Sequence, residues 1–270
     1  MKYGFIGAGN MGGAIMKGMT IGTGKYDPKS IYVTDKLFSA AEKLAEQTGI
    51  LPCERGAEVV ANADVLVLAV KPHILATAIP ELFDAIAAKK PLVVSIAAGK
   101  TLEYLGSLLP AETPIVRVMP NINAKIGAAT CGICKNAYVT AEQLEIAKGI
   151  FGTIGTVIEV DEGQFGIFTV LAGSAPAFAY LYMDALARAA VQAGMPKKQA
   201  LEIAAATVEG SAKMVLKSGE HPWELVDQVC SPGGTTIEGI LALQKYGFEH
   251  ALKEAFDAVL EKDNLIAGKK

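Results

Sequence analysis

A glycine-rich segment near the start of the chain places the strongest constraint on its fold. Gly7-Ala-Gly-Asn-Met-Gly12 follows the apolar run Lys2–Ile6 directly and leads into the helical pattern Met11–Met19. A strand, a glycine turn and a helix in this order are typical of the phosphate-binding turn of a dinucleotide-binding fold. The alternative is a glycine-rich turn that holds no ligand.

Each glycine of this turn has its own expected role. Gly7 allows the tight turn, Gly9 lets a pyrophosphate approach the backbone, and Gly12 lets the helix pack against the strand. The amides at the helix start then face the phosphates with the positive end of the helix dipole.

The chain up to residue 160 alternates short apolar runs with amphipathic stretches, which predicts an α/β fold with a Rossmann-type, doubly wound, mostly parallel sheet. The expected strands are Lys2–Ile6, Ile31–Thr34, Val65–Val70, Leu92–Ile96, Ile115–Met119, Ala128–Cys134 and Thr156–Val160. The expected helices are Met11–Met19, Ser39–Thr48, Glu81–Ala88 and Ala141–Phe151.

After Asp161 the strand-like runs give way to long Ala- and Leu-rich helical patterns. We therefore expect a dinucleotide-binding domain over 1–160 and an all-helical substrate-binding and dimerisation domain over 161–270. The expected helices are Gln164–Ala193, Lys197–Lys217, Thr235–Tyr246 and Phe248–Leu265.

Charge and hydropathy exclude several classes of protein. The formal net charge of -3, with no Lys/Arg run longer than a pair, argues against nucleic-acid binding. The uncharged stretch Gly163–Met183 is long enough to cross a bilayer, but Gly173, Ser174 and Pro176 interrupt it. We expect a core or subunit-interface helix there, with no membrane association, in a soluble cytoplasmic protein.

Four cysteines are present, two of them in the CxxC segment Cys131-Gly-Ile-Cys134. No second CxxC or pair of histidines accompanies it, and strand alternation would point these two thiols apart. The cysteines are therefore expected to be free in a reducing compartment, with no metal site. His73, His221 and His250 are interpreted as solvated or capping side chains.

Further residues predicted to contact the cofactor follow other strands, because ligands in such sheets bind beyond the carboxyl ends of the strands. Asp35 would bind the ribose hydroxyls of NAD, while the neighbouring Lys36 could neutralise the extra phosphate of NADP. We expect NAD with NADP tolerated; the alternative is that Asp35 caps the next helix. The predicted cofactor-binding residues are Ile6, Gly7, Ala8, Gly9, Asn10, Met11, Gly12, Asp35, Lys36, Ala69, Val70, Lys71, Pro72, Ala97 and Ala98.

A second anion site is expected at Ser231-Pro-Gly-Gly-Thr-Thr236, which leads into a helix. A Pro-Gly-Gly turn followed by two threonines exposes backbone amides and hydroxyls at one place, which suits a small carboxylate. A loop with plain threonine capping is the alternative.

These motifs occur in one order along the chain and together closely resemble pyrroline-5-carboxylate reductase. The resemblance extends from Lys2 to about Ala258, and its most specific motif is the Ser-Pro-Gly-Gly-Thr-Thr segment. The motifs that carry it are Gly4–Gly12, Ala69–Pro72, Arg117–Asn121, Leu171–Ala177 and Ser231–Thr236.

The resemblance implies NADH- or NADPH-dependent reduction of the cyclic imine 1-pyrroline-5-carboxylate to L-proline. It implies a homodimer formed by the helical domain, often within a ring of dimers, and a catalytic Thr236 hydroxyl beside the ring nitrogen. The residues it assigns to substrate binding are Ser231, Gly233, Gly234, Thr235 and Thr236.

Two segments depart from the family pattern. Asn121-Ile-Asn123 stands where Asn-Thr-Pro is common, and Ala175 stands where glycine is frequent. These two departures indicate a subgroup of the family. Separately, a glutamate that contacts substrate in some relatives has Gly219 at its apparent position, with Glu220 alongside.

Two other functions remain open. A 3-hydroxyacid dehydrogenase of similar architecture needs a base, usually a lysine on the helix after the boundary, whereas Phe165–Met183 carries no charge. A non-catalytic dinucleotide sensor would need an additional binding segment, and the two predicted domains occupy the whole chain.

Overall fold

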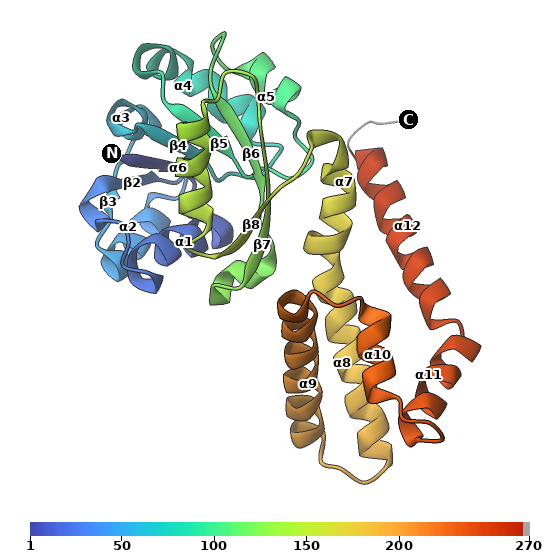
Figure 1. Ribbon diagram of the computed structural model, residues 1–270. Coiled ribbons are helices and arrows are strands. Elements are labelled where there is room, and N and C mark those ends of the chain that lie inside the picture. Colours follow the sequence, from blue (N-terminus) through green and yellow to red (C-terminus); the bar gives the residue numbers. More distant parts are fainter. Residues whose placement is uncertain (267–270) are drawn as a thin grey trace. The chain divides into compact units, whose positions relative to one another are not determined.

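The computed structural model describes residues 1–266 and divides the chain into two compact units (Figure 1). The first comprises Met1–Gly173 together with the described residues from Lys262 to Ile266, and the second comprises Ser174–Glu261. The division into domains at residue 160 stays a prediction. The predicted helical domain runs to residue 270, and its last four residues lie outside the described part.

The first unit contains an eight-stranded sheet in the order β3-β2-β1-β4-β5-β6-β7-β8. Strands β1 to β6 are parallel, and β7 joins β6 antiparallel, so the sheet is mostly parallel, as the sequence predicted. The strands are β1 Tyr3–Ile6, β2 Ile31–Thr34, β3 Leu51–Pro52, β4 Val65–Leu68, β5 Leu92–Ser95, β6 Ile115–Met119, β7 Ala129–Lys135 and β8 Gly155–Glu159.

Helices cover both faces of this sheet and bury two separate apolar cores (Figure 1). One core packs α1 (Asn10–Lys17), α2 (Phe38–Thr48) and α6 (Ala141–Phe151) on the sheet. The other packs α3 (Gly56–Asn62), α4 (Leu75–Lys89) and α5 (Leu102–Leu108) on the opposite face. Continuous burial along β1, β4 and β5 explains why these strands are mostly apolar, with the buried Ser95 as the polar residue that ends β5.

The sequence did not predict four short elements, namely β3, α3, α5 and α10 (Pro222–Val229). Each has at most eight residues, so its apolar spacing is too short to distinguish from a loop. The predicted helix Gln164–Ala193 is confirmed as one helical stretch, Glu162–Gln192, but it is not α-helical throughout. It consists of α7 (Phe165–Phe168), a π-helical turn at Thr169–Ser174 and α8 (Ala175–Gln192), and Pro176, which has no N–H to donate, lies in the first turn of α8.

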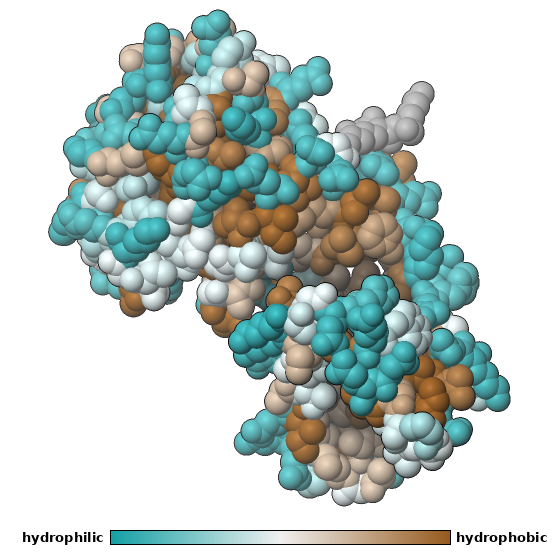
Figure 2. Space-filling view, viewed as in Figure 1, coloured by the Kyte–Doolittle hydropathy of each residue, from teal (hydrophilic) through white to brown (hydrophobic). Residues whose placement is uncertain are grey.

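The second unit consists of helices with almost no core of their own. Besides α8 and α10 it contains α9 (Lys197–Ser218), α11 (Thr235–Lys245) and most of α12 (Phe248–Ile266). Among the described residues of these helices, only Ala187, Ala200 and Ala204 are buried. Large apolar side chains remain exposed, including Leu181 at 71%, Leu216 at 85% and Tyr246 at 83%, and brown patches mark such surface in Figure 2. A helical unit of this kind needs further apolar surface against it.

Within residues 1–266, one helical stretch, Glu162–Gln192, is long and apolar enough to cross a membrane by length and composition. Only 22% of its most apolar window is buried inside the chain. The π-helical turn divides it, and an exposed apolar face suits a subunit interface equally well.

The CxxC segment lies in β7, as predicted, and the four cysteines of the chain are free. Cys131 is fully buried in the core beneath α1, α2 and α6, whereas Cys134 lies near Glu162 and Arg117. Burial raises the pKa of both thiols to about 12, so both stay protonated and unreactive at neutral pH.

Candidate active site

The parallel ladder brings the predicted cofactor-binding residues to one edge of the sheet. Ile6 is level with Thr34 on one side and with Leu68 on the other, and Leu68 is level with Ser95. Backbone hydrogen bonds continue for one residue past the ends of these strands. The Gly7 amide donates to the Thr34 carbonyl at 2.8 Å, and the Ala69 amide donates to the Ile6 carbonyl at 2.8 Å.

The three glycines of the turn differ in what a side chain would meet. A Cβ on Gly7, which has a φ of +113°, would lie 2.6 Å from the Ala69 carbonyl oxygen. A Cβ on Gly12 would lie 2.5 Å from the Gly7 carbonyl oxygen, so the helix approaches the turn too closely for any side chain. A Cβ on Gly9 would have no described atom within 4 Å. The open space lies where a bound pyrophosphate would approach the backbone.

The start of α1 is available to an anion. Gly9 is the N-cap residue, no side chain of the described chain caps it, and the first turn holds no acidic residue. The first amides of a helix have no partners within the helix, and the helix dipole makes them attractive to phosphate. The turn therefore fits the pyrophosphate of a dinucleotide.

Asp35 braces the same turn. Its Oδ2 accepts a hydrogen bond from the Ala8 amide at 2.7 Å, and its Oδ1 accepts one from the Leu37 amide at 3.0 Å. Helix α2 has Leu37 as its N-cap residue, without a side-chain cap among the described residues. The carboxylate thus connects the ends of β1 and β2 instead of capping α2.

The remaining predicted cofactor residues line the edge with varied exposure. Ala97 is 3% exposed, and its amide donates to the Ser95 hydroxyl at 3.3 Å. Lys36, Lys71 and Ala98 are exposed. These residues come from segments that follow β2, β4 and β5.

The predicted substrate-binding segment forms a tight turn before α11 in the second unit. The Gly234 amide donates to the Ser231 carbonyl at 2.9 Å, and Gly233 has a φ of +67°. Pro at the second position and a positive φ at the third are typical of a type II turn. A side chain on Gly234 would collide with Ser231.

The turn leaves the start of α11 open. Gly234 is the N-cap residue, no described side chain caps the helix, and Thr235 and Thr236 are exposed. The first-turn amides and both hydroxyls can therefore receive a carboxylate. Glu238 also lies in the first turn, so this helix start is not wholly free of acidic charge.

Two buried polar groups near the end of β6 were absent from the sequence-based site. Asn121 is 6% exposed, and its Nδ2 donates to the Ala172 carbonyl at 2.9 Å within the π-helical turn. Its Oδ1 accepts from the Asn123 and Thr130 amides at 3.3 Å each. Asn121 thus ties β6 and β7 to the segment that leads into α8.

Arg117 makes a second connection of this kind. Its Nη1 is 2.9 Å from Glu162 Oε1, which also accepts from the Leu102 amide at 2.7 Å. The guanidinium lies 4.2 Å from the centre of the Phe165 ring. Only the Arg117-Val-Met-Pro-Asn121 motif in the sequence pointed to these two residues, and it did not reveal their partners.

Comparison with known proteins gives a consistent result along the whole chain. Residues 162–265 match the family described as pyrroline-5-carboxylate reductase dimerisation, and residues 2–99 match NADP oxidoreductase coenzyme F420-dependent. The pyrroline-5-carboxylate reductase of Escherichia coli is 41% identical over 266 residues, which cover 98% of each chain.

Solved structures agree. A pyrroline-5-carboxylate reductase from Coxiella burnetii has a TM-score of 0.93 at 34% identity, over 100% of this chain and 98% of that one. The Plasmodium falciparum pyrroline carboxylate reductase with NADP bound has a TM-score of 0.86 at 27% identity, over 99% of this chain and 98% of that one.

The sheet, the open glycine turn and the helical unit define an NAD(P)-dependent oxidoreductase of Rossmann type that forms homo-oligomers. Within that class the identification is specific. The chain belongs to the pyrroline-5-carboxylate reductase family.

Two glycine substitutions should distinguish an effect on cofactor binding from an effect on stability. Gly9→Ala meets open space at a φ of -67°, so we expect its stability to stay within about 0.5 kcal/mol of wild type. Its cofactor affinity should fall on the order of tenfold, because the methyl group occupies the pyrophosphate space. Gly12→Ala forces backbone apart and should cost about 1–3 kcal/mol of stability.

Urea unfolding and fluorescence titration with NADPH measure the two effects. Normal cofactor binding by a stable Gly9→Ala variant would show that the pyrophosphate does not approach this residue.

Proposed function

We propose that this protein reduces 1-pyrroline-5-carboxylate to L-proline, the last step of proline biosynthesis, with NADPH or NADH as hydride donor. The observation that carries the proposal is the pair of open helix starts, at Gly9 and at Gly234, each preceded by a glycine turn. One suits the pyrophosphate of the cofactor and the other suits the carboxylate of the substrate. The relatives at 41% and 34% identity bear names that fit this reaction.

The cofactor supplies a hydride to the imine carbon when it is bound. The amides that follow Gly9 hold its pyrophosphate, and the carboxylate of Asp35 accepts hydrogen bonds from the adenosine ribose. Small residues after β5, Ala97 and Ala98, leave room for the nicotinamide end. The protein orients both partners, because hydride transfer needs reacting atoms about 3–3.5 Å apart.

At the substrate end, the main-chain amides of the Ser231–Thr236 turn bind the carboxylate. The Thr236 hydroxyl lies beside the ring nitrogen, where it holds a proton that makes the imine carbon a better hydride acceptor. No charged base is required, in contrast to alcohol oxidation by a 3-hydroxyacid dehydrogenase. The uncharged segment Phe165–Met183 accords with this difference.

The quaternary arrangement follows from the second unit. Its helices leave large apolar side chains exposed, and we assign this surface to a homodimer formed by the helical unit, with a ring of dimers as the larger assembly. Glu162–Gln192 is then an interface helix of a soluble, cytoplasmic enzyme without membrane contact. The net charge of -3 leaves no role for nucleic acid.

Removal of the Thr236 hydroxyl should slow catalysis. We expect Thr236→Ala to lower kcat/KM on the order of 10²-fold, the low end for assistance to proton transfer. Thr236→Ser should keep most activity because it retains the hydroxyl. The assay follows NADPH absorbance with pyrroline-5-carboxylate and quantifies proline. A Thr236→Ala enzyme within about twofold of wild type would exclude this role.

The carboxylate of Asp35 should set cofactor preference. Asp35→Ser removes a charge that repels the 2′-phosphate of NADP, so the ratio of kcat/KM for NADPH to that for NADH should rise about tenfold. Asp35→Asn is the matched control for the lost hydrogen bond from the Ala8 amide, because asparagine is neutral but can still accept that bond. An unchanged ratio in both variants would remove Asp35 from the ribose site.

Charge placed on the helical unit should dissociate the oligomer. We expect Leu181→Glu combined with Leu216→Glu to reduce the particle mass in light scattering, because burying two carboxylates at an interface is unfavourable. Tyr138→Glu, on an exposed loop of the first unit at 54% exposure, is the control and should leave the mass unchanged. An intact oligomer in the double variant would place the interface elsewhere.

A further inference from the structure

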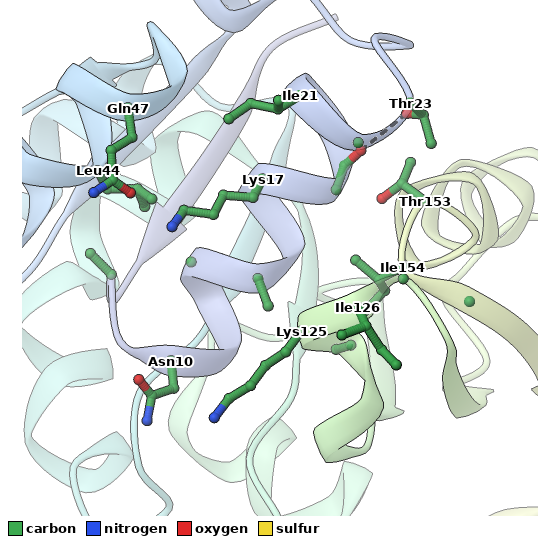
Figure 3. Close-up of a pocket in the computed structure, with 18 of the residues that line it drawn as sticks. Asn10, Lys17, Ile21, Thr23, Leu44, Gln47, Lys125, Ile126, Thr153 and Ile154 are labelled. Atoms are coloured by element: carbon green, nitrogen blue, oxygen red, sulfur yellow. Dashed lines mark hydrogen bonds between the residues drawn. The ribbon is translucent and has the colours of Figure 1, made fainter. Parts of the chain in front are cut away.

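A groove of about 1280 Å³ runs along the outer side of α1, entirely within the first unit (Figure 3). It is bordered by α2 on one side and by residues 124–127 and 152–156 on the other. This volume exceeds the 300–1,000 Å³ of ordinary small-molecule pockets, so an extended ligand fits it best.

The groove is basic. Lys17 of α1, Lys43 of α2 and Lys125 before β7 line it, and none of its described lining residues is acidic. Other lysines of the chain, such as Lys89 and Lys148, form ion pairs. Within residues 1–266, the three groove lysines have no carboxylate partner. Three unpaired ammonium groups from separate segments attract an anion in a chain of net charge -3.

Small residues form the floor of the groove. Gly9, Gly13, Gly18 and Gly22 recur every four or five residues along one side of the helical segment. Gly18 packs against Ile154 and Thr153, whereas a Cβ on Gly9 would have no described atom within 4 Å, so a ligand can approach the backbone most closely at the Gly9 end. Figure 3 shows the Lys125 side chain reaching toward Asn10 at the helix start, while Lys17 points toward α2. The groove thus offers amides at one end and ammonium groups along its length.

The groove coincides with the predicted cofactor site only at the start of α1. Ala8, Gly9 and Asn10 line both, whereas the cofactor residues after β2, β4 and β5 do not line the groove. A dinucleotide that crosses the strand ends therefore leaves most of the groove and its lysines unused.

We propose that this groove is a second anion site, which takes a small molecule bearing several phosphate groups. Its occupant shares the helix-start amides with the cofactor and so competes with NADPH. The expected competition with NADPH depends on the cofactor position proposed above. Binding of the phosphorylated molecule to the three lysines does not depend on it. The site gives the enzyme a means to be inhibited by a phosphorylated metabolite.

The test uses inorganic tripolyphosphate as probe and isothermal titration calorimetry of the whole chain at low salt. The variant Lys17→Gln/Lys43→Gln/Lys125→Gln should bind the probe about tenfold more weakly than wild type, the combined effect of three exposed ion pairs. The control Lys29→Gln/Lys90→Gln/Lys198→Gln removes the same charge from exposed positions outside the groove and should bind like wild type.

Four outcomes would overturn the proposal. Unchanged probe binding by the groove variant excludes the lysines, and equal weakening in both triple variants indicates bulk charge only. A groove variant that loses NADPH affinity as much as probe affinity shows that the lysines belong to the cofactor site. Probe binding that NADPH does not displace would separate the groove from the cofactor turn and contradict the competition.

Discussion

The close contact between the first glycine turn and the neighbouring strand ends underlies the rest of the structure. A Cβ on Gly7 would collide with the Ala69 carbonyl, and a Cβ on Gly12 would collide with the Gly7 carbonyl, so the ends of β1 and β4 and the start of α1 pack closely together. This contact fixes the position of the start of α1 above the sheet. No described side chain caps the first amides of α1, so they stay open to a ligand. The Asp35 carboxylate stabilises the turn by accepting a hydrogen bond from the Ala8 amide.

The second unit obeys a different constraint. Among the described residues of its helices, three alanines are buried and many leucines are exposed, so its stability depends on association more than on an internal core. The turn at Ser231–Thr236 lies in this unit and leaves its polar groups exposed in one chain. Oligomerisation therefore stabilises the unit by covering apolar side chains that are exposed in one chain.

Buried polar groups connect the sheet to the helix that leaves it. Asn121 satisfies a carbonyl of the π-helical turn, and Arg117 pairs with Glu162 while stacking on Phe165. Such buried groups are costly if one partner is lost, so these contacts hold α7 and the π-helical turn up to Ala172 against the sheet within the first unit. A π-helical turn often lies near a functional site, and here it comes directly before the helix that carries the dimerisation unit.

The sequence by itself determined the order of the main strands and the long helices, because buried parallel strands and helical faces have distinct apolar periods. It also determined the glycine turn, where only glycine fits the backbone approach. The tertiary structure decided what depends on contacts distant in sequence: the bond from Ala8 to Asp35, the bonds of Asn121, and the placement of Lys17, Lys43 and Lys125 along one groove. Short elements such as β3 and α5 also appeared only in the fold, since packing, not local pattern, stabilises segments of so few residues.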